Sequence, residues 1–331
     1  MTGRLRVGLL SFAHVHAPSL ASTLGTLEQV EFTGIHDDDE QRGRAAASAH
    51  GTRWHPTLAG LLGSSDAIVI ASNNADHRRY AETAAKARVH VLCEKPIATT
   101  TADAKAMIDA CRSAAVQLGT AFPVRSSPAV MALKDAIAAG SLGRIRAVRA
   151  TNPGQYPGSW FGDKRQAGGG AAMDHTVHVA DALRWLLHDE VVRVHAELGS
   201  FLYGLPVEDC GLLTLDLLSG AFASIDCSWS RPATYPTWGG VTLHVVGDRG
   251  TVDVDVFRQS LTHYDDAAGT TKLVGWGDDL NALMLGGFVD AILEGRPVPI
   301  SGEDGLRSLE VVVAAYRSAE LGRPVAIAEV A

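Results

Sequence analysis

Short apolar runs alternate with amphipathic stretches through the first third of the chain. The run RLRVGLL at residues 4–10 has the length of a buried strand, and the segment from about residue 16 to residue 27 has helical spacing. A second apolar run, VEFTGI, then ends in an acidic cluster. A strand, a helix and a second strand in this order predict a βαβ unit.

The same alternation continues as far as about residue 121. DAIVIASNN predicts a third strand, AETAAKAR a helix, and VHVLCEKP a fourth strand that Pro96 closes. A helix over 102–115 and the run VQLGTAF follow. Strands separated by single helices predict an α/β fold with a doubly wound parallel sheet.

From about residue 122 the pattern changes. A helix (PAVMALKDAIAAG) and a strand (RIRAVRAT) lead to a loop rich in Gly, Pro and aromatic residues, and GGGAAMDHTVHVADALRWLL predicts a long helix. Between residues 191 and 264 several strand-like runs follow one another without helices, which predicts a mostly antiparallel sheet in an α+β domain. Two helices close the chain. We therefore divide it into domains at 1–121 and 122–331.

Composition and charge exclude several classes of partner. The 331 residues carry a formal net charge of −8, and their Lys and Arg residues are scattered, so no basic surface for nucleic acid or an anionic membrane is expected. The apolar run before His14 is too short for a signal segment or a membrane span. We expect a cytoplasmic protein that binds a small molecule.

The turn after the first strand, Ser11–His16, stands where a dinucleotide-binding fold would place GxGxxG, and all three glycines are missing. Ser11 and Ala13 are small enough to imitate the first two glycines. His16, in the third place, should push helix and strand apart or turn outward. Alone, this segment is equally compatible with an ordinary strand-to-helix turn.

Asp37 follows the second strand, where a carboxylate accepts hydrogen bonds from an adenine-ribose diol. Asp38 and Asp39 come next and leave no basic group beside Asp37 to neutralise a 2′-phosphate, which favours NAD over NADP. The alternative is a solvated acidic turn that caps the next helix.

Two further segments offer catalytic groups. Lys95 lies at the carboxyl edge of the fourth strand and could stabilise a developing oxyanion, although a Glu-Lys pair at a strand end is more often an exposed pair without a function. Asp174, His178 and Asp181 share one helical face, which suits a histidine general acid/base, or else a hydrogen-bonded core histidine. His14, His16 and His175 invite a metal hypothesis, but no familiar ligand spacing is present and we expect no metal.

Glu94-Lys95-Pro96 and the later GGGxxxDxxxHxxD make the chain resemble the family of glucose-fructose oxidoreductase, inositol dehydrogenase and the rhizopine-catabolism protein MocA. The resemblance extends through IHDDDEQRGRAAA, SNNADH, TAFPVRSSPAVMALKDAIAAGSLGRIRAVRA and SGEDGLRSLEVVVAAYRSAELGRPV. It implies a Rossmann domain that binds NAD, followed by a domain for substrate binding and for assembly into a homodimer or homotetramer through its open sheet.

The resemblance also implies roles for individual residues. Lys95 would polarise the reacting hydroxyl, His178 would accept its proton, and Asp174 would orient either the substrate or Lys95. The expected cofactor-binding residues are Ser11, Phe12, Ala13, His14, Val15, Asp37, Ser72, Asn73, Asn74, His77, Glu94 and Arg125. Around the substrate, besides the catalytic trio, we expect Tyr156, Trp160, Arg165 and His175, with Lys164, Tyr235 and Trp238 in neighbouring loops.

Three functional hypotheses follow. The first is an NAD-dependent dehydrogenase that transfers a hydride to or from a sugar, inositol or related polyol. The second is an NAD-retaining hydrolase or lyase that oxidises its sugar transiently. The third, raised by the missing glycines, is a non-catalytic binding protein with a decayed dinucleotide fold.

Overall fold

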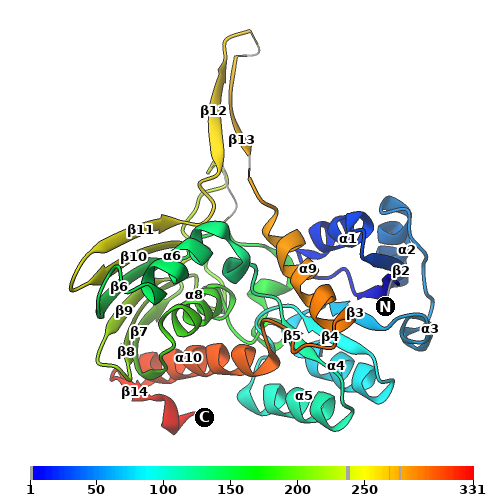
Figure 1. The fold of residues 1–331 in the computed structure, drawn as a ribbon, viewed down its shortest axis with the longest axis horizontal. Helices are drawn as coiled ribbons and strands as arrows, with labels where there is room; N and C mark the ends of the chain where they lie inside the picture. Colours follow the sequence, from blue (N-terminus) through cyan, green and yellow to red (C-terminus); the bar gives the residue numbers. More distant parts are fainter. Residues whose placement is uncertain (1–2, 236–238, 268, 276) are drawn as a thin grey trace.

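The computed structural model describes residues 3–235, 239–267, 269–275 and 277–331, and in it the chain forms two sheets and a separate hairpin (Figure 1). The smaller sheet has the order β2-β1-β3-β4-β5, and every pairing in it is parallel. Its strands are β1 (Leu5–Leu10), β2 (Val30–His36), β3 (Ala67–Ile70), β4 (His90–Cys93) and β5 (Leu118–Thr120). The predicted doubly wound parallel sheet is therefore confirmed.

Helices connect these strands, as the alternating pattern predicted. They are α1 (Ala17–Thr26), α2 (Glu40–Ala49), α3 (Leu58–Gly63), α4 (His77–Lys86) and α5 (Thr101–Ser113), with the 3₁₀ turn η1 (Asn74–Asp76) before α4. The short helix α3, which Thr57 caps by accepting a hydrogen bond from the Gly60 amide, was not predicted. All carboxyl ends of the strands meet at one edge, and the order reverses between β1 and β3, which is where such sheets bind ligands.

The larger sheet has seven strands in the order β11-β10-β6-β9-β8-β7-β14. They are β6 (Ile145–Thr151), β7 (Val191–Gly199), β8 (Cys210–Leu217), β9 (Phe222–Asp226), β10 (Thr242–Gly247), β11 (Thr251–Asp255) and β14 (Val325–Ala326). Only β6 and β9 pair in parallel, so the prediction of a mostly antiparallel sheet is confirmed.

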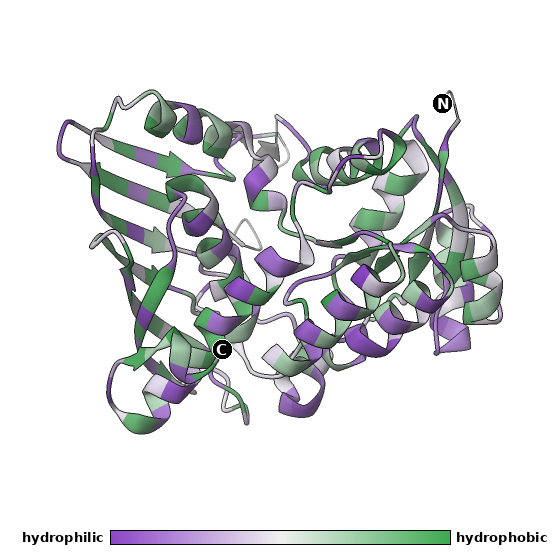
Figure 2. Ribbon diagram, turned by 60° about the horizontal axis from the view of Figure 1, so that its bottom comes forward, coloured by the Kyte–Doolittle hydropathy of each residue, from purple (hydrophilic) through white to green (hydrophobic). Residues whose placement is uncertain are grey.

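Helices cover one face of the larger sheet, as Figure 1 shows for α6, α8 and α10. The helices that follow η2 (Pro123–Ser126) are α6 (Pro128–Ala138), η3 (Ser159–Gly162), α7 (Lys164–Ala167), α8 (Ala171–Leu187), α9 (Leu280–Leu293), α10 (Gly302–Leu321) and η4 (Ile327–Glu329). Hydrophobic and hydrophilic residues alternate along the strands (Figure 2), because successive side chains of a strand point to opposite faces. The hairpin of β12 (Ser260–Asp265) and β13 (Thr270–Gly275) projects away from both sheets (Figure 1).

The last two long helices link the two halves of the chain. Leu285 and Phe288 of α9 lie in the same core as Leu9 of β1, whereas Leu309 of α10 packs with residues of α4 and α5. The division at residue 121 stays a prediction. The tail that it assigns to the second domain also packs against the first sheet.

A buried ion network ties three of these elements together. The guanidinium of Arg125, on η2, donates through Nε to Asp181 Oδ2 on α8 at 2.6 Å and through Nη2 to Asp181 Oδ1, and it also lies 2.9 Å from Asp304 Oδ1 on α10. The Asp181 side chain is fully inaccessible. Arg125 therefore neutralises a carboxylate that could not otherwise remain charged inside the protein.

Replacing Arg125 by Met should lower the free energy of unfolding by about 3–5 kcal/mol, since it leaves Asp181 buried without its cation. Equilibrium urea unfolding measures this loss. The matched control is Asp109→Asn, which removes an exposed ion pair with Arg112 and should cost no more than about 1 kcal/mol. Equal losses in the two variants would contradict a stabilising role for the buried network.

Candidate active site

Lys95 lies just beyond the carboxyl end of β4, in the segment that follows Cys93. Its side chain is 1% exposed, and its Nζ lies 2.5 Å from Oδ1 of Asp174 and 3.3 Å from the Asp174 carbonyl oxygen. The pair joins the edge of the smaller sheet to the first turn of α8. The two residues predicted as catalytic partners are therefore in direct contact.

The glycines before α8 fix the position of that first turn. Gly168 has φ of 86°, in the left-handed region, and a Cβ on Gly170 would lie 1.9 Å from the carbonyl oxygen of Glu208. The Glu208 side chain accepts hydrogen bonds from the amides of Gly170 and Ala172 at 2.9 and 3.0 Å, and a third from the Tyr316 hydroxyl. Glu208 thus caps the helix that carries Asp174.

Three groups surround the carboxylate of Asp174 besides the backbone. Trp229 Nε1 donates to Oδ2 at 3.2 Å, and Nε2 of His175 lies 3.2 Å from the same oxygen. Burial alone would raise the pKa of Asp174, but the charges of Lys95 and His175 lower it more, so that this pKa lies well below its usual value. Asp174 therefore stays ionised although it is buried.

His178 lies one helical turn after Asp174 and is 9% exposed. Its Nδ1 has no hydrogen-bond partner among the described residues, and the Phe122 ring packs edge-on with its centroid 5.9 Å away. Burial lowers the pKa of His178 well below 6.5, and the nearby Lys95 lowers it further. The imidazole is therefore neutral at physiological pH.

Lys95 and His178 face one cavity of about 470 Å³ between the two sheets. It is lined by His16, Lys95, Pro123, Val124, Asn152, His175, His178, Gly239, Gly240, Val241, Phe257 and residues 278–281. An ammonium, three imidazoles and apolar side chains around one space form the type of pocket that binds a small polar molecule.

A second cavity of about 660 Å³ lies at the switch point between β1 and β3. Its lining contains the predicted residues Ser11, Ala13, Ser72, Asn73 and Trp160, together with Asp38, Asp39, Arg42, Asp76, Tyr80, Ser159, Asp163 and Gln166. Ser11 has φ of 70° and so adopts the left-handed conformation that a glycine supplies in this turn. The cavity has a polar lining and lies where doubly wound sheets bind their ligands, so it is the place where a dinucleotide could be held.

Most backbone amides of the turn from Ser11 to His16 already donate to acceptors within the protein. The Phe12 amide donates to Asp37 at 2.6 Å, and the Ala13 amide to Ser11 Oγ at 3.2 Å. The His16 amide donates to His14 Nδ1 at 3.1 Å. In a glycine-rich loop such amides face the pyrophosphate, so here side chains must contribute more of the contact.

The structure corrects the argument built on Asp37. Arg42, five residues on, donates to both of its carboxylate oxygens at 2.8 and 2.6 Å, and the Asp39 amide donates to Oδ1 at 2.8 Å. The prediction that no basic group lies beside Asp37 is wrong, because the first turn of α2 brings Arg42 back over the end of β2. An incoming ribose must share this carboxylate with Arg42.

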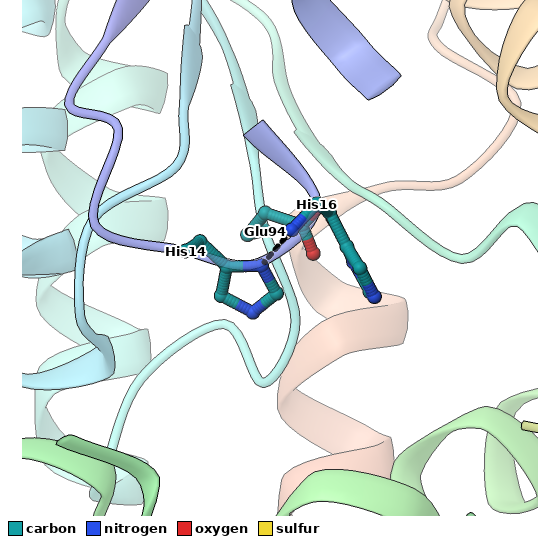
Figure 3. Close-up of side chains that lie close together, drawn as sticks. All are labelled: His14, His16 and Glu94. Atoms are coloured by element: carbon teal, nitrogen blue, oxygen red, sulfur yellow. Dashed lines mark hydrogen bonds and ion pairs between the residues drawn. The ribbon is translucent and has the colours of Figure 1, made fainter. Parts of the chain in front are cut away.

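His14, His16 and Glu94 form a compact group beside Lys95 (Figure 3), with one potential ligand atom from each within 4.8 Å of the others. His16 Nδ1 lies 3.2 Å from Glu94 Oε1, and His14 Nδ1 accepts the His16 amide. These hydrogen bonds account for the contacts without an ion. The absence of a metal stays a prediction.

Other residues predicted from the sequence line neither of the two cavities, and several of them connect segments of the chain. Asn74 donates to the Ala167 carbonyl at 2.8 Å, and Nδ1 of the buried His77 lies 3.1 Å from the Pro96 carbonyl oxygen. Phe12 and Val15 follow Ser11, and Val15 is exposed. Arg125 belongs to the ion network with Asp181.

Among the loop residues expected around the substrate, some contact other parts of the protein and others are exposed. Trp160 donates through Nε1 to the Ala13 carbonyl at 2.9 Å, and the Tyr156 ring packs 5.0 Å from that of Trp229. Arg165 is 91% exposed and lines neither cavity, so we leave it out of the site. Lys164 and Tyr235 are exposed, and Trp238 lies outside the described residues.

Sequence patterns did not reveal Trp229, Asn152 or Glu208. Asn152 donates to the His175 carbonyl at 3.0 Å, while Trp229 and Glu208 act on α8 from strand ends far along the chain. No local spacing connects such residues to the helix. In the sequence, the only sign of these residues was a Trp and a Glu among runs that are predicted as strands.

Comparison with known proteins identifies both halves of the chain. Residues 6–122 match the oxidoreductase family with an NAD-binding Rossmann fold, and residues 130–253 match the GFO/IDH/MocA C-terminal domain. Two similar proteins are the 1,5-anhydro-D-fructose reductase of Ensifer adhaerens, 32% identical over 88% of this chain and 90% of that protein, and the myo-inositol 2-dehydrogenase of Thermotoga maritima, 31% identical over 80% of each.

Among solved structures, GenD2 from gentamicin A biosynthesis, crystallised in complex with NAD, superposes with a TM-score of 0.88. The two sequences are 26% identical, and the superposition covers 98% of this chain and 97% of GenD2. Within the described residues no helix is both long and apolar enough to cross a membrane.

The buried imidazoles predict that acid destabilises the fold. Burial lowers the pKa of His14, His77 and His178, so between their folded values and 6.5 the unfolded chain binds more protons. Their contribution to stability is present above pH 6.5 and is lost as the pH falls, by up to about 1.4 kcal/mol per pH unit for each group.

Urea unfolding at pH 7.5, 6.5 and 5.5 measures this slope. His178→Gln should reduce the dependence of the unfolding free energy on pH by the contribution of one histidine. His188→Asn should leave this dependence unchanged, because His188 is exposed and Asn tolerates its φ of 48°. A wild-type stability independent of pH over this range would contradict the neutral state of these histidines.

Proposed function

Because the chain belongs to the Gfo/Idh/MocA family of NAD-binding oxidoreductases, we propose that it transfers a hydride between a nicotinamide cofactor and a hydroxyl-bearing carbon of a sugar, inositol or related polyol. One observation carries the proposal. Lys95 and His178 line one cavity at the carboxyl edge of the Rossmann sheet, and Asp174 holds the Lys95 ammonium in place.

The side chains divide the work in the oxidation direction as follows. The neutral imidazole of His178 accepts the hydroxyl proton, and the Lys95 ammonium stabilises negative charge on the substrate oxygen. Asp174 is bound to Lys95 and therefore orients it, one of the two roles that the resemblance implied. When bound, the cofactor supplies the hydride acceptor.

The pocket and the relatives support a polyhydroxylated substrate. The wall of the cavity has hydrogen-bonding groups of several kinds, which include Lys95, His16, His175, His178, Asp279 and Asn281. The similar proteins are named for an anhydrofructose and for myo-inositol. A ring with several hydroxyl groups can use donors and acceptors on both sides.

Lys95→Met and His178→Gln should each lower kcat by about 10²- to 10⁴-fold, because each removes a group that acts on the reacting hydroxyl. NADH formation from NAD is followed with a panel of inositols and aldoses. NADH binding, measured by fluorescence, should change little in either variant and serves as the test of folding. Unaltered turnover in both variants would sink the catalytic assignment.

We propose NAD as the preferred cofactor, with Asp37 as the ribose-binding carboxylate that Arg42 shares. NADH should bind more tightly than NADPH in a fluorescence titration. Asp37→Ser should reduce the difference in affinity between the two cofactors. Arg42→Ala separates the two contributions, since it leaves Asp37 charged and should widen the preference for NADH. A native preference for NADPH would show that Arg42, and not Asp37, determines recognition of the ribose.

We also propose assembly into a homodimer or homotetramer through the face of the larger sheet that no helix covers. Leu212 of β8 and Phe222 of β9 are 55% and 59% exposed on neighbouring central strands. Exposed apolar side chains on a broad sheet are typical of a surface that a partner covers. Analytical ultracentrifugation of Leu212→Asp should show a smaller species than the wild type.

A further inference from the structure

His16 occupies the place of the third glycine in the β1–α1 turn, immediately before α1. Its ring does not separate the helix from the strand. It turns into the 470 Å³ cavity, whose lining it shares with Lys95 and His178. A side chain at this place therefore reaches the substrate pocket, where a glycine would contribute nothing.

The ring of His16 is held by a buried carboxylate. Its Nδ1 lies 3.2 Å from Glu94 Oε1 (Figure 3). The other oxygen, Glu94 Oε2, accepts the Lys95 amide at 3.2 Å. Burial would raise the pKa of Glu94, but His16, His14 and Lys95 lower it more, so the carboxyl is ionised. The carboxylate therefore fixes the orientation of the His16 ring, as a carboxylate does for the histidine of hydrolase triads.

Exposure distinguishes His16 from its neighbours. Lys95, Asp174, His175 and His16 are the titratable groups that act most strongly on His178. The first three are between 1% and 4% exposed, whereas the side chain of His16 is 28% exposed. Among these groups, His16 has the best access to water.

We propose that His16, oriented by Glu94, is the residue through which the proton of the reaction leaves the substrate pocket. This inference rests on the proposed dehydrogenase function. Oxidation of a secondary alcohol breaks the C–H and O–H bonds and forms a ketone. The hydride goes to the nicotinamide, and the proton goes to His178. From His178 the proton passes to His16, directly or through cavity water, and then to solvent.

The groups around His16 come from four segments. His14 of the same turn packs edge-on at 4.5 Å between ring centroids, and Glu94 and Lys95 follow β4. His178 comes from α8, and residues 278–279 before α9 contribute two carboxylates to the same cavity. His16 therefore lies among the carboxylates of Glu94, Asp278 and Asp279 and the ammonium of Lys95.

The experiment compares His16→Gln with the wild type, using whichever inositol or aldose the wild type oxidises fastest. At low buffer concentration kcat should fall by about ten- to a hundredfold, since one step of proton transfer loses its acid/base group. Imidazole added as buffer should restore most of that loss. A solvent deuterium isotope effect on kcat should appear in the variant, and NADH affinity should stay within about twofold of the wild type if the ring acts on the proton alone.

His244→Gln is the matched control, because His244 also pairs with a carboxylate, Asp253, at 2.6 Å but lies on β10, outside the lining of the cavity. It should show neither the loss nor the rescue. Glu94→Gln should lower kcat and shift its pH dependence, since the imidazole loses its anionic partner.

The outcomes separate the two proposals. A wild type that forms no NADH with any polyol overturns the dehydrogenase function and this inference with it. An active wild type and an equally active His16→Gln variant overturn only the inference. The third outcome is a His16→Gln variant whose kcat falls, is not restored by imidazole, and is accompanied by weaker NADH binding. This result would show that His16 binds the cofactor and does not release the proton.

Discussion

The ion pair between Lys95 and Asp174 is the constraint on which the arrangement of the site depends. Both groups are almost completely removed from water, so each charge would be costly without the other. The surroundings supply what the pair alone lacks: Trp229 donates to the second carboxylate oxygen, and the carboxylate lies in the first turn of α8, where the helix dipole favours negative charge. Gly170 and Glu208 fix the start of that helix. They therefore determine where the Asp174 carboxylate lies.

The β1–α1 turn shows how a dinucleotide fold can dispense with its glycines. Ser11 accepts the left-handed conformation, and its hydroxyl, together with His14 Nδ1, satisfies amides that a glycine loop leaves free for phosphate. These amides are therefore less available to an anion. The turn also carries an imidazole, that of His16, into the cavity that Lys95 and His178 line.

The sequence predicts the parts of this site that are local and fails where contacts are distant. Apolar runs and helical spacing predict both sheets, and the spacing of Asp174 and His178 places both on one helix face, because such patterns follow from periodicity alone. Arg42 shows the limit at short range: five residues from Asp37 it looks like part of a solvated helix, but the turn at Asp39 folds it back onto the carboxylate. Trp229 shows the limit at long range, since its contact with Asp174 spans 55 residues and depends on how β9 ends against α8.

The charges around the cavity explain why it has room for one more proton. Asp174 and Glu94 are ionised beside the cavity, Asp278 and Asp279 line it, and Lys95 supplies one cation, so the acidic groups outnumber this cation. The oxidation of an alcohol releases a single proton, which such a group can accept without an excess of positive charge. His178 is a poor place to keep it, because burial and Lys95 lower its pKa. His16 has a carboxylate at 3.2 Å and access to solvent, so in the proposed relay the proton leaves the pocket on its Rossmann side.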